Sequence, residues 1–256
     1  MSSTEDKPMS FLEHLEELRW VIIKSLISLV PATVAGWYLS NRVMILLTLP
    51  LKRRGISLAY FSPAEPIFAR LKIAFFTGLF LALPYIFWQI WLFIRPALKP
   101  KERRYVRLLV PVAYILFIAG VVFAYTTVFQ VGVNFFIDFA ATSLGGLAPT
   151  FSISRYLSFA MSFLLPFGVV FELPLIFFFL ALLGLVRYRF LATNRKYAIL
   201  LIFIIAAVLT PGPDIISQLL MAAPLYILFE VSLIIVWLVE RAARRKEALA
   251  EQEESN

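Results

Sequence analysis

The stretch YLSFAMSFLLPFGVVFELPLIFFFLALLGLV, residues 156–186, decides the fold, because Glu172 is its only charged residue. About 20 apolar residues in a helix span the hydrocarbon core of a bilayer, so this run is long enough to cross a membrane. A carboxylate in that position costs about 2.5–3.5 kcal/mol on insertion scales. The stretch therefore predicts a membrane span in which Glu172 has a partner or a function.

The rest of the chain has the same character. Of its 256 residues, 61% are hydrophobic and only 16% are charged, whereas a soluble domain is about 45–50% apolar. Lipid forces each backbone polar group to bond within its own segment, so the spans should be helices. The composition therefore predicts an all-α polytopic membrane protein without a separate soluble domain.

Six apolar runs define the predicted transmembrane helices of a domain that covers about residues 20–240. They lie at about 20–39, 73–94, 108–128, 156–186, 197–209 and 215–238. An amphipathic segment, 1–19, precedes them, and a charged tail, 241–256, follows. Between the runs, 40–71 should hold short helices, and 129–155 should form a second long loop. The fifth run reaches only about 20 Å at about 1.5 Å per residue. Either the fifth and sixth runs form a tilted, partly buried helical hairpin, or the bilayer is thinner around the fifth run.

The basic residues indicate the orientation of the chain. Lys and Arg gather in 95–107, 187–196 and 241–246, all on the membrane side of the N-terminus, and are fewer on the opposite side. This positive-inside bias places both termini in the cytoplasm. The net charge of +8 is then loop charge that sets topology, which argues against a nucleic-acid surface.

The residues needed for most catalytic sites are missing from the sequence. There is no Cys, and the single His, His14, precedes the first run. A serine hydrolase triad needs a His base beside its nucleophile, and neither an HExxH motif nor a phosphate-binding glycine loop occurs. We therefore expect no catalytic residues, no metal site and no cofactor.

Acidic residues near the first and third runs are better candidates for a function. Glu16 and Glu17 stand just before the first run, and Glu102 is the lone acid among the bases of 95–104. They are either solvated charges and a weak loop ion pair or carboxylates that accept an incoming cation.

Five ordered motifs resemble one family, TatC, the multispanning subunit of the twin-arginine protein translocase. They are HLEELR at 14–19, FSPAEP at 61–66, WQIWLFIRPAL at 88–98 with ERR at 102–104, FGVVFELP at 167–174, and LTPGPD at 209–214 with SQ at 217–218. The resemblance covers about residues 10–240. The turn contains PGPD where many members have a shorter PPD form, which affects only the local turn geometry.

The resemblance implies a cupped, glove-like bundle of six helices in a prokaryotic cytoplasmic (inner) membrane. Such a protein is the receptor for folded precursors whose signal peptide carries two adjacent arginines, and the proton-motive force drives their export. Glu17 and Glu102 would accept the arginine pair, with Phe93, Leu18 and Arg19 nearby. A guanidinium offers a planar fork of donors that suits a carboxylate better than the ammonium of Lys does. Glu16 could share the role of Glu17.

The resemblance also implies partners. These are single-span subunits of the TatA and TatB types, which dock against the fifth and sixth spans, and further copies of the chain in one complex. Asp214 and Gln218 would lie near the end of that docking surface, and Glu172 would face the membrane cavity as a polar contact.

One rival function is a proton-coupled small-molecule transporter. Glu172 and Glu230 would be its proton carriers, since intramembrane acids are candidates for proton relays. The absence of detectable internal repeats and the acidic patch before the first run argue against it.

Overall fold

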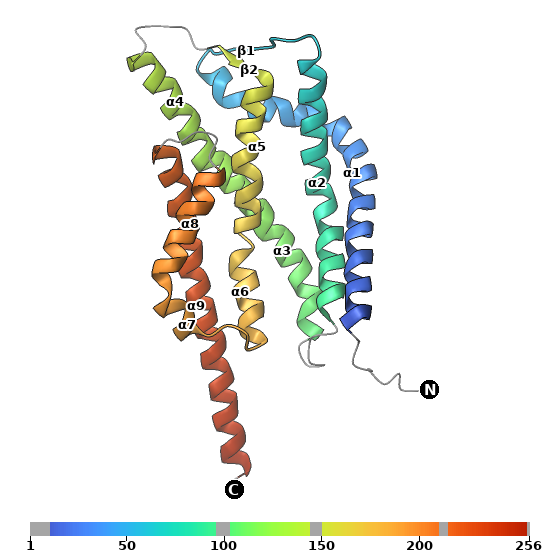
Figure 1. Cartoon of the computed structure of the whole chain (residues 1–256), viewed down its shortest axis with the longest axis vertical. Helices are drawn as coiled ribbons and strands as arrows, with labels where there is room; N and C mark the ends of the chain where they lie inside the picture. Colours follow the sequence, from blue (N-terminus) through green and yellow to red (C-terminus); the bar gives the residue numbers. More distant parts are fainter. Residues whose placement is uncertain (1–10, 96–102, 144–149, 210–214, 255–256) are drawn as a thin grey trace. The chain divides into compact units, whose positions relative to one another are not determined.

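The structure, a computed structural model, describes residues 11–95, 103–143, 150–209 and 215–254, and within them the chain is almost entirely helical (Figure 1). The elements in chain order are α1 (Phe11–Arg53), β1 (Leu58–Ala59), α2 (Glu65–Ile94), α3 (Arg103–Phe123), the π-helix η2 (Ala124–Phe129), α4 (Gln130–Ser143), β2 (Phe151–Ser152), α5 (Ile153–Val170), α6 (Leu173–Leu182), α7 (Tyr188–Thr193), α8 (Arg195–Leu209) and α9 (Ile215–Glu254).

Within these described ranges, five helical runs are long and apolar enough to cross a membrane: Leu12–Arg53, Glu65–Ile94, Leu109–Thr142, Ile153–Leu182 and Gln218–Arg245. The third run comprises most of α3, with η2 and α4, and the fourth comprises α5 and α6. The prediction of an all-helical membrane protein is confirmed. Helix α8 has only 15 residues, which agrees with the short fifth run of the sequence.

Two helices extend beyond the predicted ends of their apolar runs. Helix α1 continues to Arg53, where short separate helices were predicted, and α4 reaches Ser143 inside the predicted loop 129–155. These expectations were wrong because apolar side chains continue past the predicted ends. Leu47 and Leu51, for example, are almost completely buried, so the last turns of α1 gain tertiary packing as well as backbone hydrogen bonds.

Compact unit 1 consists of Met1–Leu46 and Ile67–Tyr114. In it the backbones of α1 and α2 approach closely at two glycines, Gly36 and Gly78. A Cβ atom at Gly78 would lie 2.6 Å from the Cα atom of Thr33, so only a residue without a side chain fits there. Small residues allow membrane helices to pack in this way.

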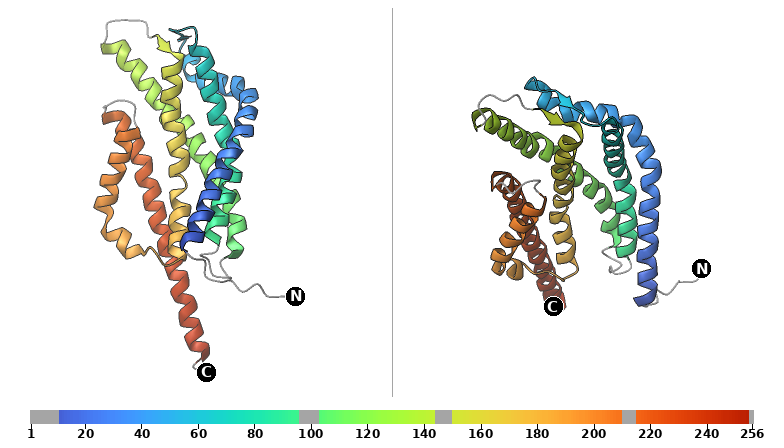
Figure 2. Two further views of the ribbon diagram at one scale, coloured as in Figure 1. Left: turned by 45° about the vertical axis from the view of Figure 1, so that its right-hand side comes forward. Right: turned by 45° about the horizontal axis from the view of Figure 1, so that its top comes forward.

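Compact unit 2 consists of Leu47–Pro66 and Ile115–Asn256. In it α6, α7 and α8 pack against α9, and α8 and α9 run side by side in all views (Figures 1 and 2). Its core is aromatic: Phe129, Phe163 and Phe167 are almost fully buried, and the Phe129 ring lies 5.7 Å from that of Tyr156.

The predicted run 156–186 is divided into two helices by Pro174. Proline has no backbone N–H, so the carbonyl of Val170 loses the donor that a continuous helix would supply. The chain tightens before the break, where the N–H of Glu172 donates to the carbonyl of Val169 at 3.0 Å, and α6 resumes with the N–H of Ile176 donating to the carbonyl of Glu172 at 2.8 Å. Glu172 therefore lies at a helix break, as the N-cap of α6.

Candidate functional site

In unit 1, the start of α1 meets the end of α2 through an aromatic contact. The rings of His14 and Phe93 stack with their centroids 4.2 Å apart and their planes 13° from parallel. On the same face of α1, the Nδ1 atom of His14 lies 3.8 Å from Oε2 of Glu17. The fold thus brings Phe93 beside the entry motif of α1, although 79 residues separate Phe93 from His14 in the chain.

Glu17 has an unusual carboxylate. About a third of its side chain is exposed, at 32%, yet its Oε2 atom is buried and has no hydrogen-bond partner among the described residues. A distance of 3.8 Å to His14 is too long for a hydrogen bond. A buried acceptor without a donor costs about 1–3 kcal/mol, so a donor that reached this oxygen would stabilise the site.

The other residues predicted for this site are only partly located. Leu18 is 37% exposed, and Arg19 is exposed beside it on α1. Glu102 lies outside the described residues, since α3 begins at Arg103. The structure therefore brings Phe93 and Glu17 together through His14 but does not test the pairing of Glu17 with Glu102.

Glu172 is buried in unit 2, with 8% of its surface exposed. Its side chain does not cap α6, and its Oε1 atom has no hydrogen-bond partner within the described part of the chain. Close packing surrounds the break, since a Cβ atom at Gly120 would lie 2.5 Å from the carbonyl oxygen of Phe167. The chain thus keeps an unsatisfied polar atom at a tightly packed helix break.

Glu230, the second acid proposed for proton transport, is neutralised by a neighbour. Its Oε2 atom lies 2.9 Å from a guanidinium nitrogen of Arg195, and its Oε1 atom accepts a hydrogen bond from the hydroxyl of Tyr226 at 2.8 Å. This ion pair joins α8 to α9.

Gln218 makes a second connection between the same two helices. Its Nε2 atom donates a hydrogen bond to the carbonyl of Phe203 at 3.0 Å. Asp214 lies outside the described residues. The structure therefore places one of the two predicted docking residues on the hairpin formed by α8 and α9.

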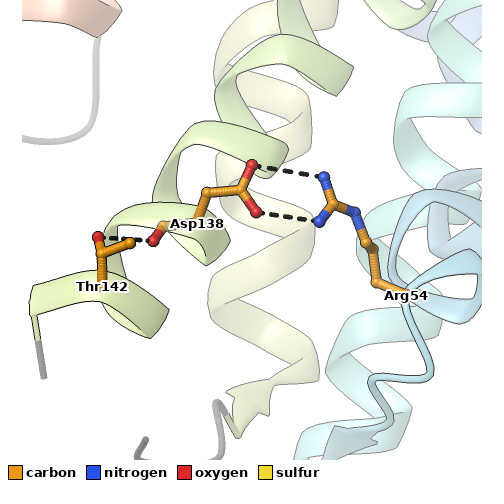
Figure 3. Close-up of polar contacts among 3 residues, drawn as sticks. All are labelled: Arg54, Asp138 and Thr142. Atoms are coloured by element: carbon orange, nitrogen blue, oxygen red, sulfur yellow. Dashed lines mark hydrogen bonds and ion pairs between the residues drawn. The ribbon is translucent and has the colours of Figure 1, made fainter. Parts of the chain in front are cut away.

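The segment between α1 and α2 is fastened to the rest of unit 2 by polar contacts. Arg54 forms a two-pronged ion pair with Asp138 of α4, at 2.9 and 3.5 Å (Figure 3). Nearby, β1 pairs in parallel with β2. The Glu65 carboxylate accepts hydrogen bonds from the Ser152 hydroxyl, from the N–H of Ser154 at 3.0 Å and from the N–H of Phe61 at 2.7 Å.

Two features of these sites were missed by the sequence interpretation. His14 was expected to have no catalytic role and was given no other, although its spacing of three residues from Glu17 places both on one helix face. Nothing in the sequence around His14 predicts its contact with Phe93. Glu65 was part of a motif, but its partners lie 87 and 89 residues away along the chain.

The class of protein is established by these elements: long apolar helices interrupted by few polar positions form an integral, all-helical membrane protein. Comparison with known proteins then gives the family. The family model of the Sec-independent protein translocase protein (TatC) matches residues 13–224.

Related sequences and a solved structure agree with that match. The chain is 48% identical over 231 residues to the TatC protein of Carboxydothermus hydrogenoformans, covering 90% of this chain and 94% of the relative. It is 34% identical to TatCy of Bacillus subtilis, covering 96% and 94%. The crystal structure of a twin-arginine translocase receptor TatC superposes with a TM-score of 0.80 at 34% identity, over 89% of this chain and 100% of that one.

The chain belongs to the TatC family. It is the receptor subunit of the twin-arginine protein translocase, a transport component and not an enzyme. The resemblance inferred from the five sequence motifs is confirmed.

Proposed function

We propose that this receptor subunit recognises the arginine pair of a signal peptide with two carboxylates, Glu17 and Glu102. One observation carries the proposal for Glu17: its buried Oε2 atom has no hydrogen-bond partner among the described residues. Arginine supplies parallel N–H donors that can satisfy both oxygens of one carboxylate. Glu102 is included in the proposed site because of its sequence motif alone.

The surroundings of Glu17 suit a peptide backbone and its apolar side chains. The exposed Leu18 and the partly exposed Phe93 offer apolar contact next to the carboxylate. Arg19 is exposed on the following position of α1. A peptide with two arginines would thus be held by charge at the pair and by apolar contact beside it.

We also propose that both termini lie in the cytoplasm, that six helices cross the membrane, and that this membrane is the bacterial cytoplasmic (inner) membrane. The excess of Lys and Arg in the segments on the N-terminal side supports the orientation. In this orientation Glu17 and Glu102 face the compartment in which folded precursors are made.

The proposed partners are single-span subunits of the TatA and TatB types, together with further copies of this chain. The exposed apolar side chains of α8 and α9, such as Leu201 and Leu219, support docking of a helix there, near Gln218 and Asp214. Glu172 would contribute a polar contact to an inserted partner or signal peptide, because its Oε1 atom lacks a donor within the described residues.

The rival function, proton-coupled transport of small molecules, is less well supported. Its second proton carrier, Glu230, is ion-paired with Arg195 and hydrogen-bonded to Tyr226. A relay would need that ion pair to open in each cycle. We therefore keep the receptor function as the conclusion.

The test measures binding of fluorescent signal peptides to the purified protein in lipid nanodiscs. One peptide carries Arg-Arg and the other Lys-Lys at the same positions. Because hydrogen bonds to charged groups contribute about 1.5–3 kcal/mol, we expect Glu17→Gln to weaken binding of the Arg-Arg peptide by about ten- to hundredfold. Glu102→Gln should have a similar effect.

The matched control is Glu13→Gln, which removes an exposed acid from the same helix and should leave binding unchanged. If the double variant of Glu17 and Glu102 bound the Arg-Arg peptide as tightly as the wild type, the two-carboxylate site would be wrong.

A further inference from the structure

We propose that His14 is a positioning residue of the arginine site. Its ring holds Phe93, and its Nδ1 atom lies beside the buried Oε2 atom of Glu17, which has no hydrogen-bond partner among the described residues. This inference rests on the proposed function, because it assigns His14 a task in recognising the arginine pair.

The first observation is the stacked ring pair. With centroids 4.2 Å apart and planes 13° from parallel, the imidazole lies flat on the Phe93 ring. The contact joins the first turn of α1 to the last turn of α2. It fixes the orientation of Phe93, whose ring would otherwise rotate about its side-chain bonds where the helix ends.

The second observation is the distance from Nδ1 of His14 to Oε2 of Glu17, 3.8 Å. At this distance the imidazole nitrogen and the carboxylate oxygen are near neighbours, but they are too far apart for a hydrogen bond. His14 therefore orients this oxygen without forming a hydrogen bond to it. The oxygen has no hydrogen-bond partner among the described residues.

The third observation is that one side chain makes both contacts. A Phe at position 14 would keep the ring contact but not the nitrogen. A Gln would keep a polar group but not the flat ring. Since His14 is the only His of the chain, its presence at this junction is consistent with a requirement for both properties.

The consequence is a site that favours a planar cation. A guanidinium that bonds to the Glu17 carboxylate would do so next to the stacked rings of His14 and Phe93, where a flat donor fork can be accommodated. The rounded ammonium of Lys gains less from this arrangement. His14 should therefore contribute to the preference for Arg over Lys more than to the stability of the fold.

The test repeats the peptide titration with His14→Ala and His14→Phe in nanodiscs. We expect His14→Ala to weaken binding of the Arg-Arg peptide by about tenfold, because the carboxylate is no longer oriented, and binding of the Lys-Lys peptide by clearly less. His14→Phe, which keeps the ring stack, should bind the Arg-Arg peptide with an affinity between those of the wild type and His14→Ala. Leu12→Ala, an exposed change on the same helix, is the control and should bind like the wild type.

The outcomes separate this inference from the proposed function. If Glu17→Gln loses the Arg-Arg peptide while His14→Ala keeps wild-type affinity for both peptides, the role of His14 is refuted and the site survives. An equal loss of both peptides in His14→Ala would also refute it, because it would indicate a purely structural residue. If Glu17→Gln itself binds normally, the proposed function fails first. If His14→Ala fails to fold, His14→Phe provides the test. A ratio of its affinities for the Arg-Arg and Lys-Lys peptides equal to that of the wild type would overturn the inference.

Discussion

Replacement of Glu172 by Leu should stabilise the folded protein while it impairs assembly. The side chain is buried, with 8% exposed, does not cap α6, and has an Oε1 atom without a hydrogen-bond partner among the described residues. Such an orphaned acceptor costs about 1–3 kcal/mol. Leu has a similar size and no polar atom, so Glu172→Leu should recover a gain of that order, reduced by the loss of the carboxylate's hydrogen bond with the Phe117 backbone.

Thermal unfolding of the purified protein in detergent measures the effect. For a chain of about this length, 1 kcal/mol corresponds to about 2–4 °C in Tm, so Glu172→Leu should melt several degrees above the wild type. Glu172→Gln is the matched control, because it keeps polar atoms in the same place and should melt at nearly the same temperature as the wild type.

A Tm of Glu172→Leu at or below that of the wild type would refute this reasoning, because it would mean that the carboxylate is satisfied in the folded state. Under the proposed role of Glu172, both variants should bind the Arg-Arg peptide normally and should lose co-purification of the small single-span subunits. Loss of peptide binding with normal co-purification would contradict that role.

Three further changes test the packing of the two units. Gly78→Val places side-chain atoms against the α1 backbone and should destabilise the protein by more than about 2 kcal/mol, measured as a fall in Tm; an unchanged Tm would contradict the close approach. Tyr156→Phe removes a buried hydrogen bond to the Leu47 carbonyl, 2.7 Å long, and should cost about 0.5–1.5 kcal/mol in chemical unfolding; no loss would mean that the hydroxyl is not bonded. A double-mutant cycle on Arg54 and Asp138 should give a coupling below about 1 kcal/mol that falls further in high salt, since both side chains are exposed; a larger coupling that resists salt would contradict this.

The helices of this chain could be predicted from sequence because lipid leaves the backbone no alternative. Glu172 stood out for the same reason, since a lone carboxylate in an apolar run is costly. The ends of the helices could not be predicted as well. Residues 40–53 contain charged residues and Pro50, which suggested separate short helices, yet these residues continue α1, in which Leu47 and Leu51 are buried.

The site was predictable only where its residues are neighbours in the chain. One motif contains Glu17, Leu18 and Arg19. The resemblance to a family added Phe93 to the predicted site. The stacking of His14 on Phe93 depends on how α1 and α2 pack, and the bonds from Ser152 and Ser154 to Glu65 depend on contacts within unit 2 between residues far apart in the chain. Such long-range contacts leave no periodic or compositional signal.

The central claim is tested most directly by the ratio of the affinities for the Arg-Arg and Lys-Lys peptides. We expect a ratio of about ten or more in the wild type. In a protein that carries both Glu17→Gln and Glu102→Gln, the ratio should fall toward one. An unchanged ratio in that double variant would contradict recognition of the arginine pair by these two carboxylates.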